Sequence, residues 1–256
     1  MIHPQSIIEP GAQIGKNVTI GPWTYIGKDV VIGDNCEINS HVVIKGPTRI
    51  GKGNRFFQFG SIGEECQDLK YNGEPTELVI GDNNTFRESC TVHRGTIQDN
   101  SLTKIGSDNL FMAYSHVAHD CIIGDNCIMA NNATLGGHVH LGDYVIIGGM
   151  SCVHQFCHIG SHSFIAANAF VSKDVPAFIM ASGYPARPLG LNSEGLKRRG
   201  FDKETIANIK RAYKQVYRKG LTVEEAIASV KTLAEQTPEV NTFIDIVINS
   251  SRGIIR

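Results

Sequence analysis

Residues 123–147, IGDNCIMANNATLGGHVHLGDYVII, carry an apolar residue at every sixth position. The same period runs from Ile14 to Val171, with a shift of one residue near the middle of the chain. A period of six matches neither the 3.6-residue repeat of a helix nor the alternation of an isolated strand. It indicates a repeat architecture in which short coils stack along one axis.

Each hexad has the composition of a short strand followed by a turn. A glycine often follows the apolar residue, and Asp or Asn often comes next, as in Gly124-Asp125-Asn126. These residues suit tight turns that adopt positive φ. A small residue stands two positions before the apolar one, so both point to the same side of the strand. Three hexads complete one triangular coil, and the sequence predicts a parallel β-helix.

The composition indicates the compartment and one class of partner. Five of the cysteines occupy the small position of a hexad, where we expect compact core residues in a reducing compartment: Cys36, Cys90, Cys121, Cys127 and Cys157. No apolar run is long enough for a transmembrane segment, and MIHPQSIIEP lacks the features of a signal peptide. We therefore expect a cytoplasmic protein with no nucleic-acid partner. Residues 187–256 carry 13 Lys and Arg against 8 Asp and Glu, which favours an acidic partner at that end.

Two segments interrupt the repeat, at residues 64–79 and 93–104. Insertions in a solenoid emerge as loops, often on the binding face. After residue 188 the apolar spacing becomes helical. We therefore divide the chain into a β-helix at residues 1–188, with these two loops, and a helical domain at residues 189–256.

Capping residues define the helices of the second domain. Asp202 is a plausible N-cap and Gly220 a stop for the first long helix. Thr222, followed by Glu225, has the spacing of a capping box that opens a second helix. A last helix is expected near Glu239–Asn249.

The repeat also predicts where histidines meet. Three apolar residues eighteen positions apart share one corner of successive coils: Val117, Leu135 and Val153. Adjacent coils lie about 4.8 Å apart, so His119, His138 and His154 should follow one edge. His140 and His158 form a second column, and two such edges favour a symmetric oligomer.

Three interpretations of the column formed by His119, His138 and His154 remain open from these residues alone. Isolated histidines on turns can be structural. Three imidazoles could bind zinc and activate a water molecule. Alternatively, His119 beside Asp120 could act as a general base, with a backbone N–H of Gly136-Gly137 holding an oxyanion.

Six local motifs resemble the UDP-N-acetylglucosamine O-acyltransferase family of hexapeptide-repeat transferases: QDLKYNGEPT (67–76), HRGT (93–96), HVAHDC (116–121), ANNATLGGHV (130–139), VHQFC (153–157) and EGLKRRGF (194–201). The resemblance covers nearly the whole chain. It implies a left-handed parallel β-helix, an exception to the usual right-handed crossover, followed by a small C-terminal α-helical domain. It also implies a homotrimer with active sites between subunits.

The same resemblance implies the reaction. A β-hydroxyacyl group would pass from acyl-carrier protein to the glucosamine 3-hydroxyl of UDP-N-acetylglucosamine, the first step of lipid A biosynthesis. His119 would be the general base, Asp120 would orient it, and the backbone N–H of Gly137 would hold the oxyanion. No metal or cofactor is expected, because the thioester is already activated and the phosphopantetheine arm arrives on the carrier.

Further site residues follow from the resemblance by position. The substrate contacts would come from the first loop and the histidine corner, at Gln67, Asp68, Lys70, His93, His116, His138, His154 and Gln155. The nucleotide and the carrier's arm would meet Asn192, Glu194, Arg198 and Arg199. The run Lys197–Arg199 suits a pyrophosphate, since Arg binds phosphate through two nitrogens.

Two positions depart from some relatives. Ala167 stands where these have Gly, at a position that the family uses to gate the acyl slot, so its methyl group is expected to shorten the acyl chain. Pro185 replaces a His, which puts one carrier or phosphate contact in doubt. The alternatives are an N-acyltransferase of the same fold, a zinc hydratase resembling γ-class carbonic anhydrases, and a non-catalytic scaffold.

Overall fold

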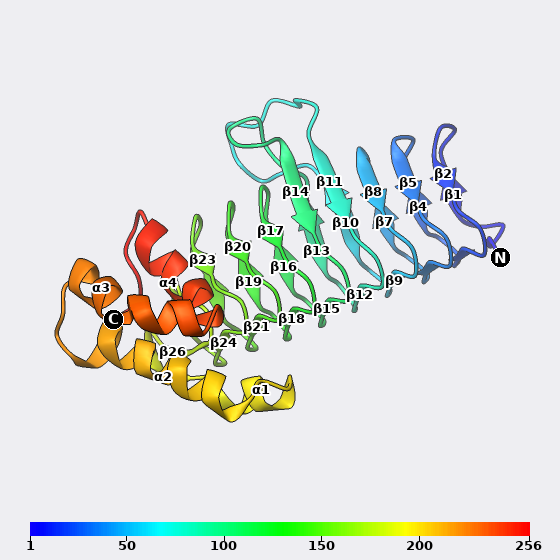
Figure 1. The fold of residues 1–256 in the computed structure, drawn as a ribbon. Coiled ribbons are helices and arrows are strands. Elements are labelled where there is room, and N and C mark those ends of the chain that lie inside the picture. Colours follow the sequence, from blue (N-terminus) through cyan, green and yellow to red (C-terminus); the bar gives the residue numbers. More distant parts are fainter.

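The computed structural model describes all 256 residues as a three-sided prism of stacked coils with four helices at one end (Figure 1). Successive strands along the chain enter three different sheets, and strands three apart in sequence pair in parallel. Each turn of the chain therefore adds one strand to every side. This arrangement confirms the predicted parallel β-helix.

The three sheets have nine, eight and ten strands. The first sheet contains β1 (Ile7–Ile8), β4 (Tyr25–Ile26), β7 (Val43–Ile44), β10 (Ser61–Glu64), β13 (Thr91–His93), β16 (His116–Val117), β19 (Thr134–Leu135), β22 (Cys152–Val153) and β25 (Phe170–Val171). The second contains β2 (Gln13–Ile14), β5 (Val30–Ile32), β8 (Thr48–Ile50), β11 (Glu77–Ile80), β14 (Leu102–Ile105), β17 (Ile122–Ile123), β20 (His140–Leu141) and β23 (His158–Ile159). The third contains β3 (Thr19–Ile20), β6 (Glu37–Ile38), β9 (Arg55–Phe56), β12 (Thr85–Phe86), β15 (Leu110–Phe111), β18 (Ile128–Met129), β21 (Ile146–Ile147), β24 (Phe164–Ile165), β26 (Ile179–Gly183) and β27 (Ala186–Leu191).

The hexad residues fill the interior of the prism. Leu135 pairs in register with Val117 on one side and Val153 on the other, and all three are buried. Phe56, Phe86 and Phe111 stack through the centre with ring centroids 4.9 and 4.5 Å apart. The five cysteines expected in the core are buried, and all seven cysteines of the chain are free thiols.

An asparagine ladder joins successive coils at one corner. The side-chain amide of Asn54 donates to the carbonyls of Gly51 and Gly81 at 2.9 and 2.8 Å. Asn84 donates to Asn54 at 3.0 Å, and its oxygen accepts from the backbone N–H of Asn109 at 3.0 Å. These buried amides satisfy turn groups that have no strand partner, so they hold the coils in register.

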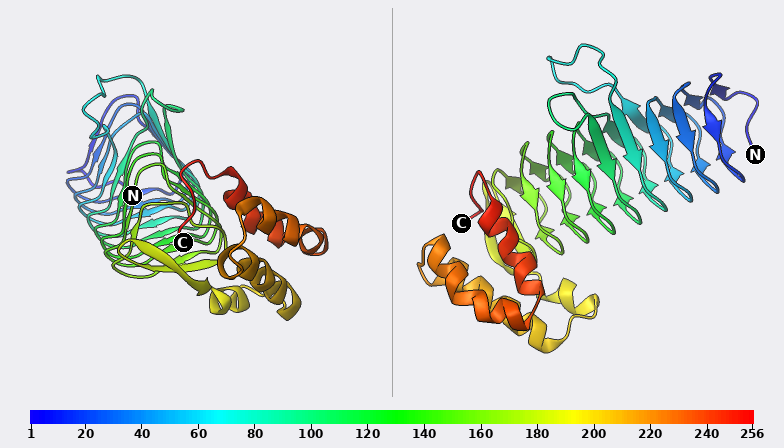
Figure 2. Two further views of the ribbon diagram at one scale, coloured as in Figure 1. Left: turned by 90° about the vertical axis from the view of Figure 1, so that its left-hand side faces the viewer. Right: turned by 45° about the horizontal axis from the view of Figure 1, so that its top comes forward.

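The two insertions leave the prism at the same edge and stand side by side (Figures 1 and 2). The first lies between β10 and β11, and the second between β13 and β14. Arg94 at the base of the second loop is buried and joins them. It donates to the Gly63 carbonyl at 2.6 Å and to the Tyr71 hydroxyl of the first loop at 3.2 Å.

The last coil ends in an antiparallel hairpin of β26 and β27, which the hexad pattern does not predict. The expected division at residues 188 and 189 falls within β27. Four helices follow: α1 (Ser193–Arg198), α2 (Lys203–Arg218), α3 (Val223–Gln236) and α4 (Glu239–Asn249). None of them is long and apolar enough to cross a membrane.

The caps of these helices agree with the sequence. Asp202 caps α2 by accepting from the Thr205 N–H at 2.8 Å. Thr222 and Glu225 form the expected capping box of α3. The chain then returns to the prism, where the buried carboxylate of Asp174 accepts from the Ser250 hydroxyl at 2.6 Å.

Candidate active site

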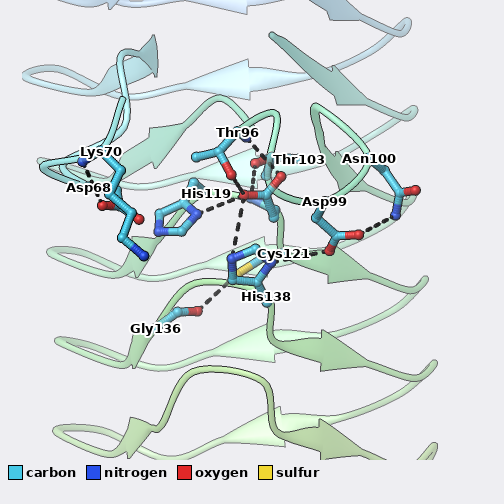
Figure 3. A network of polar contacts seen from close by, with 11 residues as sticks. Asp68, Lys70, Thr96, Asp99, Asn100, Thr103, His119, Cys121, Gly136 and His138 are labelled. Carbon is cyan, nitrogen blue, oxygen red and sulfur yellow. Dashed lines mark hydrogen bonds and ion pairs between the residues drawn. The ribbon is translucent and has the colours of Figure 1, made fainter. Parts of the chain in front are cut away.

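The turn between β16 and β17 carries a histidine–carboxylate pair (Figure 3). His119 Nδ1 lies 2.8 Å from Asp120 Oδ2. The Asp120 side chain is 1% exposed and that of His119 is 14% exposed. A neutral imidazole that donates from Nδ1 keeps an unprotonated Nε2. The pair thus has the arrangement of a general base with its orienting carboxylate.

The second insertion holds Asp120 in place. Thr96 donates its backbone N–H to Oδ1 at 2.8 Å and its hydroxyl to Oδ2 at 2.7 Å. Burial acts to raise the pKa of Asp120, but the hydrogen bonds from His119 and Thr96 outweigh it and lower the pKa below its ordinary value. Asp120 is therefore a carboxylate at neutral pH and can accept a hydrogen bond from His119 Nδ1.

Gly137, one coil further along, lies directly against the His119 ring. A Cβ built on Gly137 would stand 2.5 Å from His119 Cε1 and 2.6 Å from Nε2. No side chain fits there without moving the imidazole. The Gly137 N–H has no acceptor within the chain, so it is free to bind an oxyanion beside the base.

His138 completes a compact group with this pair. Its ring stacks on Phe156 at 4.3 Å and meets the His119 ring edge-on at 5.0 Å. Ligand atoms of His119, Asp120 and His138 all lie within 4.8 Å of one another, a spacing that could hold a metal ion. This set differs from the three histidines expected from the sequence, since Asp120 takes the place of His154.

His154 instead lies next to the C-terminal segment. Its Nδ1 is 3.0 Å from the Gln155 carbonyl and 3.3 Å from Arg252 Nη2. Arg252 also donates to the Gln155 carbonyl. The C-terminal segment thus supports this part of the corner.

An open hollow beside the pair collects six of the other predicted residues. It is lined by Gln67, Asp68, Leu69, Lys70, His93, His116, Ala118, His119 and Gln155. Leu69 of the first loop is fully exposed. The hollow combines amide, carboxylate, ammonium and imidazole groups, so it offers both donors and acceptors of hydrogen bonds.

Two histidines form the floor of this hollow. His116 Nδ1 is 2.7 Å from the Thr91 hydroxyl, and its ring meets that of His93 edge-on at 5.0 Å. Burial lowers the pKa of His93 to about 4, and His116 adds to the effect. Burial also lowers the pKa of His116. Both rings are neutral donors and acceptors at neutral pH.

The lowered pKa of His93 predicts a loss of stability in acid. The folded state binds this proton less tightly than the unfolded chain, whose histidine pKa is about 6.5. The stabilisation is therefore fully present above about pH 6.5 and is lost as the pH falls towards 4. His93→Gln should flatten the decline in the free energy of unfolding over this range. Urea unfolding at several pH values measures it.

The exposed His41 provides the control for this prediction. His41→Gln is the same substitution in an earlier coil and is measured beside His93→Gln as the matched control. An unchanged slope in His93→Gln would contradict the role assigned to His93.

The residues predicted for the nucleotide lie on a different edge of the prism. The Arg199 guanidinium is 5.0 Å from the centre of the Tyr144 ring, and its Nη1 is 3.4 Å from His162 Nδ1. Tyr144 and His162 occupy turns between the second and third sheets, whereas His119 lies between the first and second. A single chain therefore does not bring Arg199 to His119.

Four other predicted residues lie near Arg199 or away from both groups. Asn192 is buried, caps α1 by accepting from the Gly195 N–H and donates to the His162 carbonyl at 3.0 Å. Glu194 pairs with Lys197 at 2.7 Å on the surface, where Arg198 is exposed. Ala167 is exposed in a turn between the third and first sheets.

The sequence did not identify the residues that support the pair. Thr96 and Asp99 come from the second insertion. Thr103, at the end of this insertion, accepts from the Asp120 N–H at 2.8 Å. The break in the hexad period located this loop. The break did not indicate which side chains of the loop contact the active-site corner. Thr96 and Asp99 do so through residues 24 and 39 positions further along the chain.

Models of two known families match the chain. The model described as bacterial transferase hexapeptide (six repeats) matches residues 1–28 and 102–137. The model described as domain 2 of UDP-N-acetylglucosamine O-acyltransferase matches residues 174–255. The first match agrees with the repeat, and the second covers the hairpin and the helical domain.

Individual proteins are similar over the full length. The chain is 54% identical over 256 residues to an acyl-[acyl-carrier-protein]–UDP-N-acetylglucosamine O-acyltransferase from Stutzerimonas stutzeri, covering 100% of this chain and 99% of that one. The solved structure of LpxA from Acinetobacter baumannii has a TM-score of 0.98 at 52% identity, with 100% and 99% coverage. UDP-N-acetylglucosamine O-acyltransferase from Moraxella catarrhalis gives 0.98 at 47%, with the same coverage. These similarities confirm the left-handed β-helix with a C-terminal helical domain.

Proposed function

This chain belongs to the UDP-N-acetylglucosamine O-acyltransferase family of hexapeptide-repeat transferases, and we propose that it acylates the glucosamine 3-hydroxyl with His119 as general base. It is an O-acyltransferase of lipid A biosynthesis, with acyl-carrier protein as donor and UDP-N-acetylglucosamine as acceptor. The observation that carries the mechanism is the His119–Asp120 pair at 2.8 Å beside the free Gly137 N–H.

The first step moves one proton and forms one bond. Nε2 of His119 takes the proton of the sugar 3-hydroxyl as that oxygen attacks the carbonyl carbon of the acyl thioester. The imidazolium that forms is stabilised by the Asp120 carboxylate on Nδ1. Thr96 keeps Asp120 in position through two hydrogen bonds, so the ring does not need to reorient during the reaction.

The second step breaks the carbon–sulfur bond. The Gly137 N–H donates to the tetrahedral oxyanion, which lies next to the base because Gly137 packs against the His119 ring. The oxyanion then collapses and expels the phosphopantetheine thiolate. His119 returns its proton to the sulfur, which leaves an ester on the sugar and a free thiol on the carrier.

The hollow provides the contacts for the acceptor sugar. We assign Gln67, Asp68 and Lys70 of the first loop to its hydroxyl and acetamido groups. His93 and His116 complete the floor as neutral hydrogen-bonding rings. His138 contacts the base, and His154 and Gln155 lie further along the same edge. Leu69 of the first loop is fully exposed next to these groups, so it is suited to contact a bound substrate.

We place the complete active site between subunits of a homotrimer. The residues proposed to bind the nucleotide and the carrier's arm, Asn192, Glu194, Arg198 and Arg199, lie on a different edge of the prism from His119. Ala167, proposed to limit the acyl chain, lies on the third edge. Packing of one subunit's edge against its neighbour's would bring such groups together, as a symmetric assembly of prisms allows.

The mechanism uses no metal ion or cofactor of the enzyme. Asp120 already accepts hydrogen bonds from Thr96 and His119, so a metal bound to the group would displace the contact that orients the base. The donor thioester is activated before it reaches the site, and a thiolate is a good leaving group. We also propose that the protein is cytoplasmic.

One assay tests the function and distinguishes it from the alternatives. The protein should transfer β-hydroxyacyl groups from acyl-carrier protein to UDP-N-acetylglucosamine at the same rate with and without a chelator. The product should be an ester at the sugar 3-oxygen, identified by mass spectrometry and NMR. A rate abolished by chelator would favour the zinc site. No transfer with any of several chain lengths would exclude the function.

A further inference from the structure

Asp99 lies in the second insertion and makes a contact outside its own loop. Its Oδ2 is 3.1 Å from His138 Nδ1, 39 residues further along the chain. The neighbouring Asn100 amide donates to its other oxygen at 2.9 Å, which steadies the carboxylate (Figure 3). The His138 side chain is 7% exposed and that of Asp99 is 34% exposed.

His138 therefore lies between two carboxylates. Its Nδ1 faces Asp99, and its Nε2 is 3.8 Å from Asp120 Oδ2, beyond hydrogen-bonding distance. The ring has little freedom to turn, because it stacks on Phe156 and abuts His119. Which nitrogen carries the proton in the neutral ring is set by its hydrogen-bond partners. Asp99, at the shorter distance, favours the proton on Nδ1.

This choice of tautomer matters for Asp120. Its Oδ2 already accepts from His119 Nδ1 at 2.8 Å and from the Thr96 hydroxyl at 2.7 Å. A His138 ring with its proton on Nε2 would be a third donor to the same oxygen after a small movement. It would compete with His119 for the carboxylate that orients the base.

We infer that Asp99 is a positioning residue: by holding the His138 proton on Nδ1, it reserves Asp120 for His119. The inference rests on the proposed function, because its effect on rate requires His119 to act as the base. The second insertion thus has two roles at the pair. Thr96 binds Asp120 directly, and Asp99 removes a competing donor.

The test compares Asp99→Ala with Asp99→Asn. Asp99→Ala should lower kcat about 10-fold, the lower end of the roughly 10- to 100-fold loss seen when a partner that orients a metal-bound histidine is removed, with little change in KM for the sugar nucleotide. Asp99→Asn should restore most of kcat, because the amide oxygen of the new side chain still accepts from Nδ1. Gln98→Ala, an exposed change in the same loop, is the matched control and should behave as the wild type.

Nitrogen-15 NMR of histidine-labelled protein reads the tautomer directly. The His138 signals, assigned by their absence in His138→Gln, should show the Nδ1–H form in the wild type and the Nε2–H form in Asp99→Ala. An unchanged tautomer in Asp99→Ala, or an imidazolium in the wild type, would overturn the inference. So would a loss of kcat that Asp99→Asn fails to restore, since it would indicate a merely structural loop contact.

The two readouts separate this inference from the proposed function. If the wild-type protein transferred no acyl group, the function would be wrong, and the role of Asp99 in catalysis would be wrong with it. If acyl transfer were intact and Asp99→Ala had wild-type kcat, only the role of Asp99 would be wrong.

Discussion

Replacing His119 with Ala should reduce kcat for acyl transfer by about 10³-fold, within the range of about 10² to 10⁴ for a positioned acid–base group. The change removes the atom that accepts the hydroxyl proton. KM for UDP-N-acetylglucosamine should change much less, because the hollow keeps its other lining residues. Steady-state kinetics with purified acyl-carrier protein measures both quantities.

The control for this change is His41→Ala. His41 is an exposed histidine in a turn on another edge of the prism, so its loss should leave kcat and KM unchanged. Thermal unfolding of both variants shows whether the β-helix is intact. A folded His119→Ala enzyme with wild-type kcat would exclude His119 as the general base.

Replacing Gly137 with Ala should reduce kcat by about 10²-fold or more, comparable to the loss of one oxyanion donor. The new methyl group would stand 2.5 Å from His119 Cε1, so the ring or the backbone must move. Either movement separates the base from the N–H that holds the oxyanion. The loss should appear in kcat, with the circular dichroism spectrum of the β-helix unchanged.

Gly27→Ala is the matched control, because Gly27 follows a strand of the same sheet in an earlier coil. A Cβ at Gly27 would meet its nearest neighbours at 3.5 Å, which is ordinary contact. This variant should retain wild-type activity. If Gly137→Ala also retained it, the close packing of Gly137 on His119 would not matter for catalysis.

Much of the fold could be predicted from short stretches of sequence. The hexads around Val117, Leu135 and Val153 stack as expected, since a buried residue at each strand is required in every coil. The helix caps at Asp202 and Thr222 and the range Glu239–Asn249 were also predicted correctly. These features depend on contacts within a few residues or on a fixed period.

The hairpin of β26 and β27 and the short helix α1 were not predicted. The antiparallel pairing of Ile179 with Leu191 closes the last coil and has no counterpart in the hexads before it. Helix α1 depends on the Asn192 cap, whose amide is also held by the His162 carbonyl 30 residues earlier. Such contacts carry no local pattern.

In the candidate site, too, contacts that are local in sequence were predictable and long-range contacts were not. His119 and Asp120 are adjacent in sequence, and a turn in a known coil makes their contact predictable. Thr96 and Asp99 reach Asp120 and His138 only because the second loop folds back over the corner. Arg94 fixes the base of that loop through Tyr71 of the first one.

By itself, the sequence determined the β-helix, the edge that carries the histidines and the breaks at which the loops emerge. The reason is that these follow from a period of six, which each short strand and turn satisfies locally. Only the tertiary structure decided that Asp120 replaces His154 in the group around His119, and that Arg199 and Ala167 lie on other edges. Those placements depend on how loops and helices pack against distant coils. Residues that form such long-range hydrogen bonds do not recur at a fixed period, so the sequence pattern does not reveal them.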